Sequence, residues 1–184
     1  MAEKSVVITG TSRGIGFHLA NRFLSEGYRV IGISRSQTPI THAKFKQIIS
    51  DLSQPKEVNN LSNELENYSI CGLINNAGIH GPIGAFETID FNDWIETFNT
   101  NIFSAAILSQ ICIPSLRSTR GFIIFLSGGG SAFPRAFYSA YGVSKCAVIR
   151  LADTLAVELM PDVLVYCVAP GPNRTTLLEE ARQS

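Results

Sequence analysis

Hydrophobic residues follow two alternating periodicities along the chain. Short runs rich in β-branched residues, typical of buried parallel strands, occupy residues 4–10, 28–34, 45–50, 71–78, 121–127 and 163–171. Longer segments with the spacing of amphipathic helices occupy residues 16–27, 56–68, 91–116 and 140–160. Because strands and helices take turns, the sequence predicts an α/β fold: a doubly wound parallel sheet of six strands with helices on both faces, a three-layer αβα sandwich.

Residues at the helix ends support these boundaries. Gly27 is placed to end the first helix, because glycine readily adopts the left-handed conformation that follows a helix. Pro55 suits the first turn of the second helix, where its missing N–H is not needed. Either Asp90 or Asn92 can cap the long segment that follows.

The composition indicates one globular domain spanning residues 1–184. Of the 184 residues, 45% are hydrophobic, and no repeat, low-complexity tract or linker divides them. The 15 basic residues are balanced by 15 acidic ones, which does not favour nucleic-acid binding. No apolar run approaches the roughly 18 residues of a membrane span, and the first is too short for a signal peptide. We therefore expect a cytoplasmic protein without nucleic-acid or membrane partners.

The cysteines suggest neither disulfides nor a metal centre. Cys71, Cys112, Cys146 and Cys167 lie far apart and form no C-x-x-C pair. We expect reduced, packed thiols and no metal site.

The loop at Thr9–Gly16, with the sequence TGTSRGIG, joins the first predicted strand to the first helix. Ligands of doubly wound sheets bind at the carboxyl ends of the strands, where this loop lies. Its glycines allow the backbone to approach a ligand closely, and the following helix offers N–H groups to a pyrophosphate, although a glycine loop can also be a simple turn. The loop residues predicted to contact a dinucleotide are Gly10, Ser12, Arg13, Gly14, Ile15 and Gly16.

Three further motifs follow this loop: NNAG at 75–78, YGVSK at 141–145 and PGPNRT at 170–175. Together with the T-G-x-x-x-G-x-G loop, they resemble the short-chain dehydrogenase/reductase family over nearly the whole chain. The resemblance implies a Rossmann-like fold, a nicotinamide dinucleotide, and reversible hydride transfer between a carbonyl and an alcohol.

Tyr141 and Lys145 are the predicted catalytic pair. A ketone reduced by hydride needs a proton donor, and a phenol with a reference pKa of about 10 can serve if that pKa is lowered. Their spacing of four places both side chains on one helix face, where the ammonium favours the phenolate. The resemblance also implies that Lys145 holds the nicotinamide ribose. The alternative is an exposed pair on the first turn of a helix.

The resemblance further implies a serine and an asparagine. Ser127, at the end of the fifth strand, is the predicted donor to the substrate oxygen, with Ser131 the nearest substitute. Ser127 lies 14 positions before Tyr141, slightly more than is usual, and the intervening candidate, Gly128, has no side chain to donate. Asn101 matches the helix asparagine that holds a water of the proton relay; a kink-forming amide bonded to the backbone is the alternative.

The residues expected around the adenosine favour NADP(H) over NAD(H). The second strand ends in GISRSQ, without the carboxylate that would bind a free ribose 2′-hydroxyl. Arg35, beside Ser34, and Arg13 can bind a 2′-phosphate through charge-assisted hydrogen bonds, unless both are solvated surface charges. The resemblance adds the cofactor contacts Asp51, Leu52, Asn75, Ala77, Gly78, Tyr141, Lys145, Pro170, Gly171 and Thr175.

Four other side chains lie near these motifs or on the long helical segment. His80 either contacts substrate or is polar surface, and Tyr138 borders the pocket without the four-residue relation to Lys145. Trp94 and Phe98, four positions apart, are expected to pack in the core or an interface.

The chain ends soon after the PGPNRT motif, where family members commonly continue with a substrate loop, further helices and another strand. We therefore expect an intact cofactor site, an absent substrate lid and a sixth strand exposed as an edge. The resemblance also implies a homodimer through the helices around 92–117 and 139–160.

Two functions follow from these features. The leading one is an NADP(H)-dependent oxidoreductase that interconverts a small-molecule carbonyl and a secondary alcohol, with Tyr141 as acid and base. The alternative, favoured by the short C-terminus, is a dinucleotide-binding protein with a regulatory or scaffolding role and little turnover.

Overall fold

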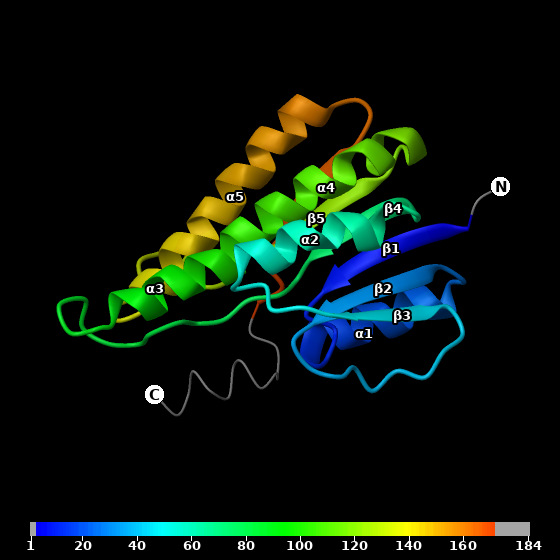
Figure 1. Cartoon of the computed structure of the whole chain (residues 1–184). Helices are drawn as coiled ribbons and strands as arrows, with labels where there is room; N and C mark the ends of the chain where they lie inside the picture. Colours follow the sequence, from blue (N-terminus) through cyan, green and yellow to red (C-terminus); the bar gives the residue numbers. More distant parts are fainter. Residues whose placement is uncertain (1–2, 172–184) are drawn as a thin grey trace.

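Six parallel strands form one sheet in the computed structural model, which describes residues 3–171 (Figure 1). The strands are β1 (Lys4–Thr9), β2 (Arg29–Ser34), β3 (Phe45–Ile49), β4 (Ser69–Asn75), β5 (Phe122–Leu126) and β6 (Leu164–Val168). Their order in the sheet is β3-β2-β1-β4-β5-β6, and every neighbouring pair is parallel. The order reverses between β1 and β4, which is where such sheets bind ligands. The predicted doubly wound α/β fold is confirmed.

The helices cover the two faces of the sheet unequally. They are α1 (Gly14–Ser25), α2 (Pro55–Leu65), α3 (Phe91–Phe98), α4 (Ser104–Thr119) and α5 (Ser139–Leu159). One buried apolar cluster joins the sheet to α2, α4 and α5, and a second, smaller cluster joins the opposite face to α1 (Figure 1). Burial of these apolar side chains is the main stabilising term of the fold.

The predicted helix boundaries match the structure at three places. Gly27 follows the end of α1 with a φ of +87°, the left-handed conformation expected of it. Pro55 is the first residue of α2. Of the two candidate caps, Asp90 is the one used, since its side chain accepts a hydrogen bond of 2.8 Å from the Asn92 N–H.

The segment 91–116 is helical throughout, as predicted, but an irregularity that the sequence did not predict lies within it. A π-helical turn, η1 (Asn99–Phe103), separates α3 from α4. A π turn inserts one extra residue into a helix and is common at functional sites. Asn101 lies inside η1, so the irregularity sits at a residue singled out from the sequence.

Strand β6 forms one edge of the described sheet. Within residues 3–171 it pairs with β5 alone. Leu164 and Tyr166 on this strand are 55% and 51% exposed among the residues that the structure describes.

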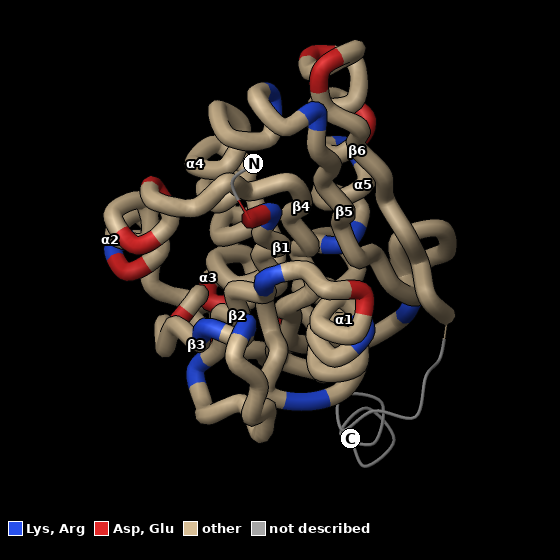
Figure 2. The backbone as a smooth tube through the Cα atoms, turned by 90° about the vertical axis from the view of Figure 1, so that its right-hand side faces the viewer, with Lys and Arg blue, Asp and Glu red and all other residues tan. Residues whose placement is uncertain are grey.

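Positions of Lys and Arg and positions of Asp and Glu are both distributed along the backbone in Figure 2, in keeping with the balanced composition. Among the helices of the described residues, none has both the length and the apolar character to cross a membrane.

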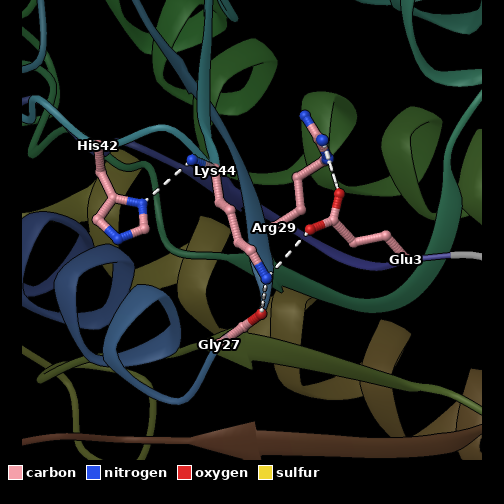
Figure 3. A network of polar contacts seen from close by, with 5 residues as sticks. All are labelled: Glu3, Gly27, Arg29, His42 and Lys44. Atoms are coloured by element: carbon pink, nitrogen blue, oxygen red, sulfur yellow. Dashed lines mark hydrogen bonds and ion pairs between the residues drawn. The ribbon is translucent and has the colours of Figure 1, made fainter.

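A polar network ties together the amino ends of the first three strands (Figure 3). Glu3 accepts a 2.8 Å hydrogen bond from Arg29 Nε, and its other carboxylate oxygen lies 3.2 Å from Lys44 Nζ. Lys44 Nζ also donates to the Gly27 carbonyl at 3.0 Å, and the Lys44 N–H donates to His42 Nδ1 at 3.1 Å. Hydrogen bonds from Arg29 and then Lys44 lower the pKa of Glu3. The network lies at the opposite end of the strands from the site described next, so its role is structural.

Candidate active site

A cavity of about 810 Å³ opens at the carboxyl ends of the strands. The loops that follow all six strands contribute to its lining, from Gly10 after β1 to Pro170 and Gly171 after β6. The cavity therefore lies at the reversal point of the sheet, as the fold predicts.

The glycine loop is held open by backbone conformation and by one asparagine. Gly10 and Gly14 have φ values of +72° and +59°, which favour glycine. Asn76 Nδ2 donates to the Thr9 carbonyl at 2.8 Å and to the Gly10 carbonyl at 3.3 Å. A Cβ at Gly10 would lie 2.8 Å from that nitrogen, so the loop can pass over β4 only without a side chain there.

The entrance of α1 faces the same cavity. Its N-cap residue, Arg13, makes no side-chain capping bond to the first turn, and Arg13, Gly14 and Ile15 line the cavity. The first N–H groups of a helix have no partners within the helix and carry the positive end of its dipole. The loop, the helix start and the cavity together fit the pyrophosphate of a dinucleotide.

The far end of the cavity is formed by residues at and after the ends of β2 and β3. The predicted cofactor contacts Ser34, Arg35, Asp51 and Leu52 all line it. Ser34 Oγ donates to the Ser36 carbonyl at 2.8 Å, which shapes the turn that carries Arg35. Asp51 Oδ1 accepts from the Ser53 N–H at 3.0 Å, leaving its other oxygen for a ligand.

Lys145 is buried at the other end of the cavity. Its side chain comes from α5, and Nζ donates a 2.8 Å hydrogen bond to the Leu126 carbonyl at the end of β5. Burial lowers the pKa of Lys145 to about 8. The ammonium is therefore fixed and poorly solvated, which strengthens its action on nearby groups.

Tyr141 is largely buried beside Lys145, with the Lys145 Nζ 5.8 Å from the centroid of its ring. Burial raises the pKa of Tyr141, and the Arg135 charge opposes this shift. The net shift of the Tyr141 pKa is therefore upward, and not downward as expected, because desolvation of the phenol outweighs nearby charge.

The Tyr141 hydroxyl lies directly against the backbone of Gly128. A Cβ built on Gly128 would overlap the hydroxyl oxygen and lie 3.1 Å from Tyr141 Cζ. At Gly129, the next residue, the corresponding space is open. Gly128 thus provides the room that the phenol occupies, a role that no sequence motif indicates.

Ser127 lines the cavity next to Gly128. Its Oγ donates to Ser131 Oγ at 3.1 Å, and Ser131 Oγ in turn donates to the Gly128 carbonyl at 2.8 Å. The two serine candidates therefore form one chain of hydrogen bonds around the turn. Within residues 3–171, no hydrogen bond joins either serine to the Tyr141 hydroxyl.

Asn101 does not line the cavity; its amide holds the surrounding backbone. Its Oδ1 accepts from the Ile79 N–H at 2.9 Å, and its Nδ2 donates to the Ile79 carbonyl and to Ser144 Oγ, both at 2.9 Å. These contacts match the alternative of a backbone-bonded amide at a helix irregularity. They also fix the loop after β4 against α5, one position from Lys145.

Two other predicted cofactor residues do not line the cavity. Gly16 packs under the glycine loop, where a Cβ would collide with the Gly10 carbonyl. Asn75 is buried and its Nδ2 donates to Ser109 Oγ on α4 at 3.4 Å, so Asn76 rather than Asn75 borders the cavity. The strand alternation that points Asn75 toward α4 accounts for this difference. Thr175 lies outside the described residues.

A row of side chains whose roles the sequence did not settle lies at the Tyr141 end of the cavity. His80 packs edge-on against the Tyr141 ring with centroids 4.8 Å apart, and against Tyr138 at 5.9 Å. The Arg135 guanidinium carbon lies 3.7 Å from the centroid of the Tyr138 ring. His80 and Arg135 both line the cavity. Their positions depend on contacts between the loop after β4 and the loop after β5, which no local motif reveals.

The fold and the cavity define an α/β protein with a nucleotide-type site at the carboxyl edge of its sheet. The sequence model of the family described as short chain dehydrogenase matches residues 4–184. The chain belongs to the short-chain dehydrogenase/reductase family, whose members bind a nicotinamide dinucleotide.

Individual relatives are identical to this chain at about 30% of the aligned positions. The benzil reductase ((S)-benzoin forming) of Saccharomyces cerevisiae is 30% identical over 98% of this chain and 76% of its own length. The human mitochondrial dehydrogenase/reductase SDR family member 2 is 30% identical over 95% of this chain and 67% of its own length. The ligand-free aldohexose dehydrogenase of Thermoplasma acidophilum superposes with a TM-score of 0.90 and 31% identity, over 99% of this chain and 71% of that one. These likenesses support an oxidoreductase that acts on carbonyl or alcohol groups.

Proposed function

We propose that this protein is an NADP(H)-dependent oxidoreductase that interconverts a carbonyl and a secondary alcohol, with Tyr141 as the acid and base. The observation that carries the proposal is the single cavity that begins at the glycine loop and ends at Tyr141 and Lys145. A dinucleotide seated by its pyrophosphate at the loop extends along this cavity toward Tyr141. The bound nicotinamide would supply or accept the hydride.

Tyr141 would transfer the proton. Because burial raises its pKa, the phenol is protonated at neutral pH and can donate to a carbonyl oxygen as that oxygen gains negative charge. The buried Lys145 ammonium stabilises the phenolate that remains. It is fixed for this role by its bond to the Leu126 carbonyl.

Ser127 would orient the substrate oxygen. Ser127 lines the cavity next to Gly128, the residue that the Tyr141 hydroxyl lies against, and its hydroxyl can exchange its bond to Ser131 for one to the substrate. Asn101 would be a positioning residue: its amide holds Ile79 and Ser144 near Lys145.

Preference for NADP(H) rests on the charge at the far end of the cavity. Arg13 and Arg35 both line it, and Arg35 directly follows the second strand. A guanidinium binds a phosphate dianion through paired charge-assisted hydrogen bonds, whereas it gains little from a free hydroxyl. Arg35→Ala should therefore weaken NADPH binding about tenfold or more and change NADH binding by less than about twofold.

The test measures cofactor binding and turnover separately. NADPH and NADH are titrated by nicotinamide fluorescence, and a carbonyl panel that includes benzil, with aldohexoses for the reverse direction, is assayed with wild type and Tyr141→Phe. We expect tighter binding of NADPH and turnover that Tyr141→Phe lowers by about 100-fold or more. Equal affinity for both cofactors would refute the arginine argument, and equal turnover by Tyr141→Phe would refute the role of Tyr141.

One observation favours a second function, a dinucleotide-binding protein with little turnover. Within residues 3–171, the Tyr141 hydroxyl accepts no hydrogen bond from Ser127 or Lys145. NADPH binding without reduction of any carbonyl in the panel would support this alternative over the enzyme.

A further inference from the structure

Arg135 brings a positive charge to the Tyr141 end of the cavity. It comes from the loop between β5 and α5, and it lines the same cavity as Tyr141 and Lys145. Its charge reaches the phenol, since it opposes the rise in the pKa of Tyr141. Arg135 was not among the residues predicted from the sequence.

The guanidinium is held in place by aromatic packing. Its carbon lies 3.7 Å from the centroid of the Tyr138 ring, in cation–π contact. Tyr138 is only 7% exposed and packs edge-on against His80, which packs edge-on against Tyr141. This contact uses one face of the guanidinium and leaves the N–H groups at its edge available to a ligand.

No carboxylate neutralises Arg135 within the described residues. Arg22, Arg29, Arg117 and Arg150 each form an ion pair with an aspartate or glutamate, whereas Arg135 forms none with residues 3–171. Among the described residues that line the cavity, the only acidic one is Asp51, which belongs to the opposite, adenosine end. Arg135 is exposed, so it places a positive charge without a carboxylate partner at the border of the cavity, where such a charge attracts an anion.

We propose that Arg135 selects carbonyl substrates that carry a carboxylate near the reacting carbon, such as 2-oxo acids, and the corresponding hydroxy acids in the reverse direction. The inference rests on the proposed oxidoreductase function. The carboxylate would bind the guanidinium edge while the carbonyl oxygen faces Tyr141. The reaction remains hydride addition to carbon and proton transfer to oxygen, and the carboxylate takes no part in either step.

The first experiment tests anion binding without turnover. Benzoate and its neutral isostere benzamide are titrated into the full chain, with and without NADPH, and followed by calorimetry. Wild type should bind benzoate about fivefold tighter than benzamide or more, and Arg135→Gln should bind both alike. The matched control is Arg150→Gln, which removes an exposed arginine that does not line the cavity, and it should keep the preference. The absence of a preference in wild type, or its survival in Arg135→Gln, would overturn the proposal.

The second experiment compares benzoylformate with its methyl ester as substrates. Arg135→Gln should lower kcat/KM for benzoylformate about fivefold to tenfold and leave the ester within about twofold. Added salt should reduce the wild-type preference, because the interaction is between charges. An equal loss on both substrates would overturn the proposal, since Arg135 would then act on the reaction and not on the carboxylate. Failure to reduce any carbonyl, with the benzoate preference intact, would count against the proposed enzyme while leaving the anion site supported.

Discussion

Substitution of Gly128 by alanine tests the geometry around Tyr141 with a single methyl group. Neither Gly128 nor Gly129 has a left-handed φ, so alanine adds no backbone strain at either position. At Gly128 the new Cβ would overlap the Tyr141 hydroxyl, whereas at Gly129 it meets nothing within 4 Å. Gly129→Ala is therefore a matched control in the same turn.

Gly128→Ala should lower the rate of the reaction and leave the stability of the fold nearly unchanged. The hydroxyl must withdraw by about 1 Å, and a displacement of about 1 Å of a catalytic group can lower kcat about 100-fold. The clash involves the far end of one side chain, and alanine restricts the unfolded chain, so the free energy of unfolding should change by less than about 1 kcal/mol. NADPH affinity should stay unchanged, because the glycine loop is not touched.

The assay is steady-state kinetics on the best carbonyl of the panel, together with urea unfolding and NADPH titration. Gly128→Ala should lower kcat about 100-fold, and Gly129→Ala should lower it by less than about threefold. In a Tyr141→Phe background, where the hydroxyl is absent, Gly128→Ala should cause no further loss. Wild-type kcat in Gly128→Ala would refute the contact between this backbone and the Tyr141 hydroxyl.

Three further predictions concern the serine, the buried lysine and the assembly. Ser127→Ala should lower kcat about 100-fold and Ser131→Ala less than about tenfold in steady-state assays, and the reverse ranking would make Ser131 the donor. The pKa of Lys145 is about 8 in the folded state, against an ordinary 10.5, because burial disfavours the charged amine. The free-energy cost of burying this charge is therefore complete below pH 8 and becomes smaller as the pH rises from 8 to 10.5. Wild type should therefore gain about 2 kcal/mol of unfolding free energy relative to Lys145→Met between pH 7 and 9.5 in urea titrations; parallel curves would contradict the burial of the charge. Phe103 on η1 and Val143 on α5 are 48% and 50% exposed, and we expect both to lie in a homodimer interface. Light scattering at micromolar concentration should give the mass of a dimer, and Val143→Glu should reduce that mass. A monomeric wild type would exclude this interface.

The fold was predictable because its signals are local. β-branched runs separated by helical segments require a parallel sheet, and each observed strand lies within or close to its predicted run. The glycine loop and the Tyr141–Lys145 spacing identified both ends of the cavity, since helix periodicity alone places residues four apart on one face.

Contacts between distant segments limited the prediction of the site. Asn75 and Asn76 stand side by side in one motif, and only the pairing of β4 with β1 and the packing of α4 decide which of them faces the cavity. The π turn at Asn101 depends on hydrogen bonds to Ile79 and Ser144, which come from two other elements. A single-sequence pattern carries no information on such partners.

The sequence by itself determined the α/β architecture, the glycine loop and the identity of the Tyr141 and Lys145 pair, because propensity, periodicity and short motifs act over a few residues. Only the tertiary structure decided the environment of these groups. Burial sets the direction in which the pKa of Tyr141 shifts. Because Gly128 has no side chain, there is room for the Tyr141 hydroxyl. The aromatic row from Tyr141 through His80 and Tyr138 to Arg135 likewise exists only after two loops have packed together. Desolvation and packing depend on the whole surrounding fold, so neither is encoded in any short stretch of the chain.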